Sequence, residues 1–385
     1  LWNEGVDGAR ATIDAWAAQR GVTHELVVGD DGSTVGGAPA LAAAMGLQAV
    51  GAQRWSGELH GTPVSLVRLP HAGKGATLNV LASHARHGVL VTVDADTLPT
   101  PGSLRRLSAA FRKPEVDLAT GVVSIANGRE GWLTGNQSAE YLKNALVRIA
   151  WAALGGLEQL PGAFTGVRAE VFHAAGGFPE DSLTEDYELA YRVMALGVRR
   201  GRPPEVACVL RAQVFTRGPS TVGGFIRQRT RWFAGFLSTL LRFRHLVFDP
   251  RAGAYGLVRL PLKVIDAILP ALAFTSLVVL LRGGLVTALG VTRLSIALFL
   301  VRWVWDLCVF GLALRASRLL GDRAAGERAA PSLPVAWLLT SLEALTYVWL
   351  KHAAALRGTA WAFARLRRWE PSRESTAVAH DSTQP

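Results

Sequence analysis

Residues 89–96 read VLVTVDAD, a nearly apolar run that stops abruptly at two aspartates with one residue between them. A run of this kind is typical of a strand that is buried on both faces of a sheet. Open α/β sheets bind their ligands at the carboxyl ends of the strands, which is where Asp94 and Asp96 stand. The segment therefore predicts an α/β sheet with an acidic site at one edge.

The segments on both sides of this strand alternate between strand and helix. Further strands are expected at 25–28 and 64–69, and helices at 10–20, 39–50, 75–87 and 101–112. A long amphipathic helix is expected at 138–157, and a loop followed by a helix around 184–186. This order predicts an open, mostly parallel sheet with flanking helices.

A second acidic loop, Asp30-Asp31-Gly32-Ser33, follows the strand at 25–28. It could hold the base and ribose of a nucleotide, although Asp-Gly is also ordinary turn chemistry. Lys74 stands between Gly73 and Gly75, where it could reach a phosphate or could be an exposed loop lysine.

Asp94 and Asp96 offer hard oxygen ligands, which suit Mg²⁺ or Mn²⁺. An ion held there would bridge the oxygens of a diphosphate. Two aspartates in this spacing also occur as solvated turn residues, so that the spacing alone leaves both interpretations open.

Thr184-Glu185-Asp186 stands where a helix is expected to begin. In a purely structural interpretation Thr184 caps the helix, and the two acids interact favourably with its dipole. In a functional interpretation Asp186 is a general base.

The segment Gln228-Arg229-Thr230-Arg231-Trp232 precedes the most apolar part of the chain. Arg231 could bind diphosphate oxygens, and Trp232 could stack on a sugar ring. The alternative is an Arg/Trp anchor at a bilayer surface.

The apolar residues of the chain are concentrated after Leu257. Half of the 385 residues are hydrophobic, the mean hydropathy is +0.23, and long apolar runs occur only at 257–281, 294–314 and 333–350. Since about 20 apolar residues span a bilayer, the first two runs are long enough and the third is marginal. We expect a catalytic domain at 1–250, a membrane region with about three spans at 251–369, and a disordered tail at 370–385.

The net charge of +11 indicates an anionic partner. Arginines flank the apolar runs, which favours lipid headgroups, and the sequence contains no zinc-finger or RNP-like motif for nucleic acid. Arg315, Arg318, Arg323 and Arg328 place the loop between the second and third runs inside, and with it the catalytic domain. Basic residues from Lys351 onward conflict with a third crossing. Residues 352–369 could form an interfacial helix, or the third run could fail to cross the bilayer fully.

Taken in order, five motifs resemble those of the family 2 glycosyltransferases. The resemblance is closest to the membrane-bound branch with the cellulose, hyaluronan, chitin and poly-N-acetylglucosamine synthases, and it covers about residues 1–250. The motifs are Asn3-Glu4, Asp31 in D-D-G-S, Asp94 and Asp96 in D-x-D, Asp186 in T-E-D, and Gln228, Arg231 and Trp232 in Q-x-x-R-W. Because Leu1 reads as the end of a strand, the first strand is expected to be truncated.

The resemblance implies a GT-A fold and an inverting, single-displacement transfer that depends on Mg²⁺ or Mn²⁺. Asp186 would deprotonate the acceptor, and Asp94 and Asp96 would bind the metal. The implied nucleotide contacts are Glu4, Asp30, Asp31, Lys74 and Asp94. The implied diphosphate and acceptor contacts are Gln228, Arg231, Trp232 and Glu185.

The function that this resemblance implies is a β-glycosyltransferase of the bacterial plasma (inner) membrane with a cytosolic catalytic domain. It would pass N-acetylglucosamine or glucose from a UDP-sugar to a growing polysaccharide, with accessory export subunits as partners. The alternative is non-processive transfer of one sugar to a lipid carrier or another membrane acceptor. The Q-x-x-R-W motif favours the polymer, whereas the small membrane region favours the alternative. A scaffold with a decayed site is disfavoured, because Asp31, Asp96, Asp186 and Arg231 are all present.

Overall fold

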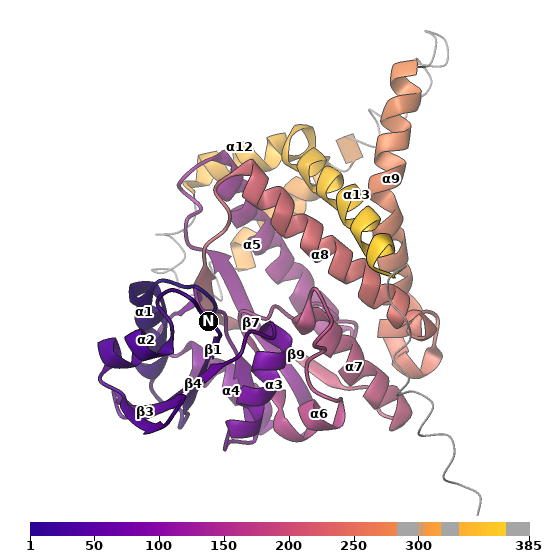
Figure 1. Ribbon diagram of the computed structural model, residues 1–385. Coiled ribbons are helices and arrows are strands. Elements are labelled where there is room, and N and C mark those ends of the chain that lie inside the picture. Colours follow the sequence, from indigo (N-terminus) through magenta and orange to yellow (C-terminus); the bar gives the residue numbers. More distant parts are fainter. Residues whose placement is uncertain (283–299, 302, 317–330, 367–385) are drawn as a thin grey trace, which may run out of the picture.

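The chain is described by a computed structural model, which covers residues 1–282, 300–301, 303–316 and 331–366 (Figure 1). The strand expected at 89–93 is present as β5 (Val89–Thr92). It lies at one edge of a five-stranded sheet with the order β5-β8-β7-β9-β6. The other strands of this sheet are β6 (Leu98–Pro99), β7 (Val116–Ile125), β8 (Thr165–Arg168) and β9 (Glu205–Thr216).

A second sheet has four strands in the order β1-β4-β3-β2. Its strands β1 (Leu26–Asp31) and β4 (Thr62–Leu69) confirm the strands expected near 25–28 and 64–69. The other two, β2 (Gln48–Gly51) and β3 (Arg54–Leu59), form a hairpin. The helix expected at 39–50 ends earlier, because Gly46 adopts the left-handed conformation with φ 68° and terminates α2 (Ala38–Met45).

The prediction of a mostly parallel sheet is wrong. Among the paired strands of the described residues, only β1 with β4 and β7 with β9 run parallel. The other pairs are antiparallel. The reason is that β8 enters between β5 and β7 in the opposite direction, and the β2–β3 hairpin extends the smaller sheet.

The expected helices of the first 200 residues are confirmed, with shifted ends. The long helix expected at 138–157 begins six residues earlier and ends at Ala153. The helices are α1 (Val6–Ala17), α3 (Lys74–His84), α4 (Ser103–Ser108) with a 3-10 turn at Ala109–Arg112, α5 (Trp132–Ala153), α6 (Ala169–Ala174) and α7 (Glu185–Arg199).

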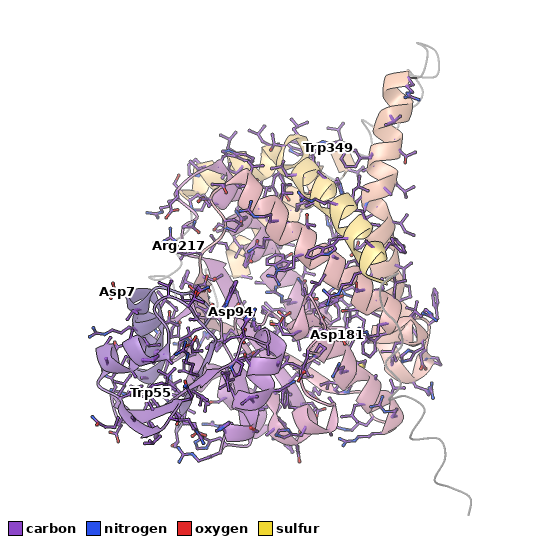
Figure 2. All side chains as sticks on the ribbon, viewed as in Figure 1. Asp7, Trp55, Asp94, Asp181, Arg217 and Trp349 are labelled. Carbon is purple, nitrogen blue, oxygen red and sulfur yellow. The ribbon has the colours of Figure 1, made fainter. Side chains whose placement is uncertain are left out.

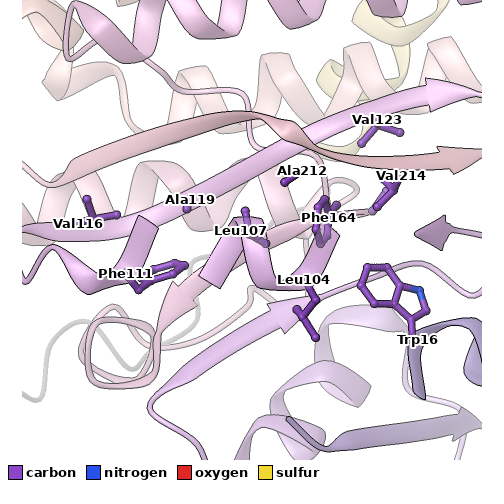
Figure 3. Packing of buried hydrophobic residues seen from close by; sticks show 11 residues of the cluster. Trp16, Leu104, Leu107, Phe111, Val116, Ala119, Val123, Phe164, Ala212 and Val214 are labelled. Carbon is purple, nitrogen blue, oxygen red and sulfur yellow. The ribbon is translucent and has the colours of Figure 1, made fainter. Parts of the chain in front are cut away.

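The two faces of the five-stranded sheet bury separate hydrophobic clusters. On one face, Trp16 and Phe164 pack with α4 and the 3-10 turn, as Figure 3 shows. On the other, Phe172 and Phe178 pack with α6 and α7. Each large side chain buried in this way contributes about 1.5–3 kcal/mol. The Trp16 Nε1–H also donates to the Thr97 carbonyl (2.8 Å), which fixes the loop after β5 against the core.

Three long helices lie on the side of the molecule away from the four-stranded sheet (Figure 1). They are α8 (Val222–Arg242), α9 (Leu260–Arg282) and α13 (Tyr347–Leu366), and α13 lies alongside α8 (Figure 1). The backbones of α8 and α13 nearly touch, because a Cβ on Gly358 would lie 2.8 Å from the Thr230 carbonyl. Shorter pieces are α12 (Leu333–Leu342), the 3-10 turn Glu343–Leu345 and a helical stretch at 303–316.

No single helix within the described ranges is both long enough and apolar enough to cross a bilayer. One pair, Leu333–Leu342 with Tyr347–Arg365, meets these criteria only when its two helices are taken together, and it bends by 54° at the break. The expected span at 257–281 corresponds to α9, and the one at 333–350 falls within the bent pair. The expected span at 294–314 lies partly outside the described residues. Outside them altogether are Arg318, Arg323, Arg328 and the tail at 370–385.

Candidate active site

Lys74 lies between two other predicted site residues, Asp94 and Glu185, and each of the three comes from a different part of the fold. Lys74 is the first residue of α3, Asp94 follows β5, and Glu185 is the first residue of α7. The Lys74 ammonium lies 2.7 Å from a carboxylate oxygen of Asp94 and 2.8 Å from one of Glu185. Asp94 lies near the centre of the molecule (Figure 2). Lys74 is therefore an ion-paired site residue rather than a free loop lysine.

The charge of Lys74 is secured by its neighbours. Burial by itself would lower the pKa of the ammonium, but the carboxylates of Asp94, Glu185 and Asp186 outweigh burial and raise the pKa well above its usual value. Lys74 is consequently a permanent cation beside the strand ends, able to face the phosphate oxygens of a ligand.

Asp186 occupies a small cavity next to this group. The cavity is lined by Asp186 together with Thr92, Leu160, Thr165, Val167, Phe178 and Leu189. Burial, and next the charge of Glu185, raise the pKa of the Asp186 carboxyl. A carboxylate whose pKa lies above the usual aspartate range accepts a proton more readily, which suits a general base.

The backbone of Gly162 holds the Asp186 side chain. Its N–H donates to Asp186 Oδ2 (2.6 Å), while the Tyr187 N–H donates to Oδ1 (2.8 Å). A Cβ on Gly162 would stand 3.0–3.2 Å from the Asp186 carboxyl group, so that the absence of a side chain allows this close approach.

Thr184 occupies the N-cap position of α7 as expected, but its hydroxyl makes no capping hydrogen bond. The side chain packs against α8 instead, where a Cβ on Gly235 would lie 2.3 Å from Thr184 Oγ1. The purely structural interpretation of this threonine is therefore wrong in its detail. The contact places α8 directly over the start of α7.

The two aspartates after β1 have different surroundings. Asp30 is fully buried, and its carboxylate accepts the N–H groups of Ser33 (2.9 Å) and Ala38 (2.7 Å), which fixes the loop and the start of α2. Both oxygens of Asp30 are thus turned toward the chain itself, and its contact with a nucleotide stays a prediction.

Asp31 supports the segment that leads to Lys74. Its two oxygens accept the N–H groups of Ala72 (2.8 Å) and Gly73 (3.1 Å), and Oδ2 lies 3.0 Å from His71 Nδ1. Burial would raise the pKa of Asp31, but these backbone N–H groups and the neighbouring imidazole outweigh it, and the pKa lies below its usual value. Asp31 thereby couples the end of β1 to the start of α3.

Two aromatic residues beside Asp31 were not singled out from the sequence. The indole of Trp2 stacks on His71 at 5.0 Å with the rings 19° apart, and Trp2 remains 54% exposed. The next residue, Asn3, accepts the Thr34 N–H (2.9 Å), and Glu4 is exposed beside it. The only available signal for Trp2 was its position directly before Asn3-Glu4.

The D-x-D carboxylates are accessible to a ligand. Asp96 is exposed and accepts the Thr216 hydroxyl (3.1 Å), while Asp94 is 37% exposed. Within the described part of the chain, no group of three or more His, Cys, Asp or Glu residues is arranged to hold a metal ion. Mg²⁺ is commonly bound by one or two carboxylates plus substrate phosphates and water, and Asp94 with Asp96 fits that donor set.

Helix α8 brings the Q-x-x-R-W residues to the start of α7. The Arg231 guanidinium donates to the Leu183 carbonyl (3.0 Å), directly before Thr184-Glu185-Asp186. One turn of helix contains both Gln228, which is half-buried, and Trp232, whose ring is covered by Arg229 at 4.5 Å. The sequence did not indicate that Arg229 is buried.

Two family models match the chain. One, described as glycosyl transferase family group 2, matches residues 89–363, and the other, glycosyl transferase family 2, matches residues 1–176.

Curated relatives share about a quarter of their aligned residues with the chain. A beta-monoglucosyldiacylglycerol synthase of Nostoc sp. is 25% identical, over 59% of this chain and 49% of its own length. A poly-beta-1,6-N-acetyl-D-glucosamine synthase of Staphylococcus epidermidis is also 25% identical, over 44% of this chain and 40% of its own length. The chain thus spans about half or less of the length of these relatives.

Among solved structures, the mannosyltransferase PcManGT from Pyrobaculum calidifontis, in complex with GDP-Man and Mn2+, has a similar fold. The match has a TM-score of 0.57 at 18% identity and covers 94% of this chain and 85% of that one. The described chain therefore has an α/β fold of the GT-A type.

Proposed function

Since the chain belongs to glycosyl transferase family group 2, and is therefore a sugar-transferring enzyme, we propose that it transfers one sugar from a nucleotide-activated donor to a lipid acceptor. From the sequence alone, a growing polysaccharide was the first candidate acceptor and a single transfer to a lipid was the second. The lipid acceptor is now preferred, because curated relatives from two organisms carry the name beta-monoglucosyldiacylglycerol synthase. The polymer remains the second candidate, which the poly-N-acetylglucosamine synthase relative favours.

The observation that carries the proposal is the juxtaposition of a fixed cation, an accessible pair of carboxylates and a buried carboxylate. Lys74 contacts Asp94 and Glu185, and the pKa of Asp186 next to them is raised. A transfer from a nucleoside diphosphate needs neutralisation of the leaving group and a base for the acceptor hydroxyl. This arrangement supplies both.

In the proposed reaction Asp186 takes the proton of the acceptor hydroxyl. The hydroxyl oxygen then attacks the anomeric carbon from the side opposite the diphosphate, and the new carbon–oxygen bond forms as the bond to the phosphate oxygen breaks. The electron pair of the broken bond stays on the diphosphate, next to Lys74. The proton stays on Asp186, and the configuration of the sugar is inverted.

Asp94 and Asp96 would hold a divalent cation, Mg²⁺ or Mn²⁺, which when bound offsets the charge of the leaving diphosphate. Lys74 secures the position of Asp94 before the donor arrives. Arg231 at the Leu183 carbonyl keeps α8 against the loop that leads to Asp186. Trp232 offers the acceptor an apolar indole face with a polar N–H at its edge, which suits a lipid whose hydroxyl has to reach Asp186.

The variant Asp96→Asn is expected to weaken UDP binding in the presence of Mn²⁺ by roughly 10–100-fold, because one of two charged ligands is lost. Binding without metal should change little. Calorimetric titration of UDP with and without Mn²⁺ measures both values. Asp7→Asn, an exposed aspartate on α1, is the control. An unchanged dependence on Mn²⁺ would remove Asp96 from the metal site.

A membrane location is part of the proposal. Apolar side chains that are at least half exposed cover α9, the stretch at 303–316 and α12, and they include Ile265, Leu272, Trp305 and Leu338. A lipid acceptor is presented at such a surface. The plasma membrane, with the catalytic domain on its cytosolic side, is the location that we propose.

Product analysis tests the proposal. The full chain in vesicles that contain diacylglycerol is incubated with Mg²⁺ or Mn²⁺ and with radiolabelled UDP-glucose, UDP-N-acetylglucosamine or GDP-mannose in turn. We expect one lipid-soluble product that carries a single sugar. A ladder or a high-molecular-weight product would overturn single transfer in favour of polymer synthesis.

A further inference from the structure

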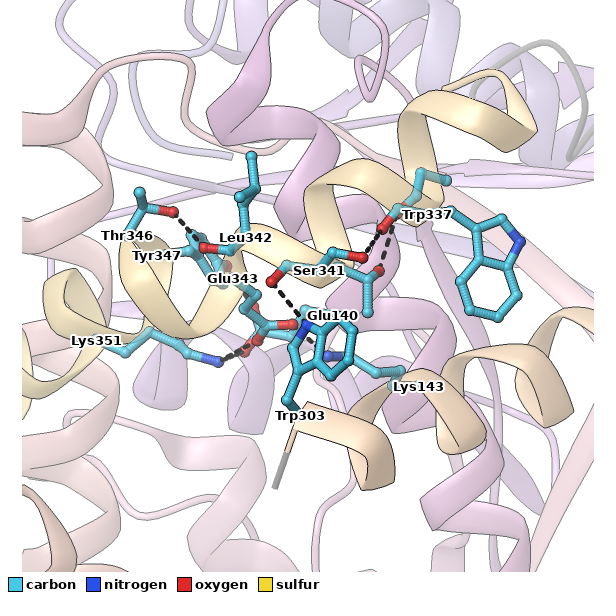
Figure 4. A network of polar contacts seen from close by, with 12 residues as sticks. Glu140, Lys143, Trp303, Trp337, Ser341, Leu342, Glu343, Thr346, Tyr347 and Lys351 are labelled. Carbon is cyan, nitrogen blue, oxygen red and sulfur yellow. Dashed lines mark hydrogen bonds and ion pairs between the residues drawn. The ribbon is translucent and has the colours of Figure 1, made fainter. Parts of the chain in front are cut away.

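A largely buried polar network connects α5, α8 and α13. Figure 4 shows the part of it that joins Glu140 and Lys143 to Glu343, Tyr347 and Lys351. Glu140 on α5 lies at its centre, with 12% of its side chain exposed. Its carboxylate accepts two hydrogen bonds from the Arg229 guanidinium (3.3 and 2.6 Å) and another from the Tyr347 hydroxyl. Lys351 bridges Glu140 (3.6 Å) to Glu343 (3.1 Å). Lys143 pairs with Glu343 on its other side.

The network ends at the indole of Trp232. The guanidinium carbon of Arg229 lies 4.5 Å from the centre of the Trp232 ring and 5.0 Å from that of Phe225. Arg229 and Trp232 are three residues apart, and so they share one face of α8. Arg231 is bonded elsewhere, to the Leu183 carbonyl. Within Q-x-x-R-W, the intervening Arg229 is thus the arginine that touches the tryptophan.

We propose that Glu140 and Tyr347 are positioning residues for the acceptor site, which act by fixing Arg229 against the face of Trp232. The inference rests on the proposed function, since it takes Trp232 as the surface that the acceptor touches. Under this proposal α13, which begins more than 100 residues after the end of α8, contributes to the acceptor site.

The chemistry of the network suits a role in orienting Arg229 better than a role in stabilising the fold. A buried ion pair is often no more stabilising than apolar side chains of the same volume, because the two charges lose their hydration. A planar guanidinium, however, can bond a carboxylate along its edge while it stacks on a ring with its face, and an ammonium cannot. The Nε of Arg229 has no hydrogen-bond partner among the described residues, so that Glu140, Tyr347 and the two rings define its orientation.

Glu140 also stays charged. Burial would raise the pKa of Glu140, but Arg229, Lys351 and the Tyr347 hydroxyl outweigh it and lower the pKa to about 2. Glu140 therefore favours its ionised form, which is the form that pairs with Arg229.

A double-mutant cycle between Arg229 and Trp232 tests the inference. Arg229→Lys keeps the charge and loses the stack, and Tyr347→Phe removes the hydroxyl that donates to Glu140 and accepts from Arg229. In the full chain, Arg229→Lys is expected to raise the KM for the acceptor on the order of tenfold. Tyr347→Phe should act in the same direction but less. The donor KM and the Tm should change little in both. Arg251→Lys, in an exposed ion pair with Asp249, is the matched control.

The decisive measurement is the effect of Arg229→Lys in a Trp232→Ala background. If Arg229 acts through Trp232, the acceptor KM of the double variant should be within twofold of that of Trp232→Ala alone. An equal increase in both backgrounds, or an equal increase in the donor KM, would overturn the inference.

The outcome is separable from that of the proposed function. If the wild-type chain builds a polymer instead of a glycolipid, the proposed function fails, and the same cycle is measured with the polymer acceptor. If Trp232→Ala leaves the acceptor KM unchanged, the inference fails even when lipid transfer is confirmed.

Discussion

Asp186→Asn is expected to lower kcat for sugar transfer by about 10³-fold or more, while the affinity for UDP stays within a few-fold of that of the wild type. An amide has nearly the shape of the carboxylate, but it cannot accept the acceptor's proton. Single-turnover transfer and UDP calorimetry measure the two quantities. Asp181→Asn is the matched control, because Asp181 lies in the preceding loop and pairs with Arg242. If Asp186→Asn instead abolished UDP binding, Asp186 would be a donor contact and not the base.

Two opposing effects act on the stability of the same variant. The pKa of Asp186 is raised in the folded chain, so that the folded state binds its proton more tightly than the unfolded state. The stability that this proton contributes is present below the unfolded pKa and is lost as the pH rises through the folded pKa. The neutral amide removes the cost of burying an ionised carboxylate, but it can accept only one of the two backbone N–H groups that Asp186 accepts, so that the Tm should change little. An unchanged or higher Tm would separate loss of the base from loss of the fold.

Gly162→Ala is expected to lower kcat by about 10–100-fold with little change in UDP affinity. The added Cβ would stand 3.0–3.2 Å from the Asp186 carboxyl group, and the hydrogen bond from the Gly162 N–H is only 2.6 Å long. Asp186 would have to shift, and even a small displacement of a reacting group lowers the rate of the chemical step strongly. The backbone of Gly162 does not have a positive φ, so that the expected loss comes from the contact and not from strain.

The control for Gly162→Ala is Gly88→Ala. A Cβ on Gly88 would meet nothing within 4 Å, and Gly88 also lacks a positive φ. Comparison of kcat for the two variants isolates the effect of crowding at Asp186. An unchanged kcat in Gly162→Ala would mean that Asp186 tolerates displacement, which would argue against its role as the base.

The sequence indicated the centre of the site because strand ends carry a local signal. The change from apolar residues to acids at Asp94 marks the end of β5, and the structure brings Asp94, Lys74 and Glu185 within ion-pair distance. The two aspartates after β1 were harder to assign. Neighbouring side chains of a strand point to opposite sides, and no local feature tells that Asp30 supports α2 while Asp31 supports the approach to Lys74.

Strand direction and long-range contacts could not be predicted in this way. The antiparallel entry of β8 between β5 and β7 depends on pairing between distant segments, which the alternation of strands and helices does not encode. Likewise, Glu140 meets Arg229 across 89 residues and Tyr347 across 207. In the sequence Glu140 belongs to an expected amphipathic helix, Arg229 lies within the Q-x-x-R-W segment, and Tyr347 lies within an expected membrane span. Only their packing against one another makes them a network.

Lys74 also has a consequence for how the donor arrives. Because Asp94 and Glu185 already serve as its counter-ions, the site does not present an unscreened positive charge to solution. In the proposed reaction a diphosphate and a divalent cation would bring nearly cancelling charges. Lys74 would then face the phosphate and Asp94 would help to hold the cation, so that entry would be an almost electroneutral exchange of partners. Long-range attraction contributes little to such an encounter, and so the rate of donor capture is set by diffusion and shape and should be nearly independent of ionic strength.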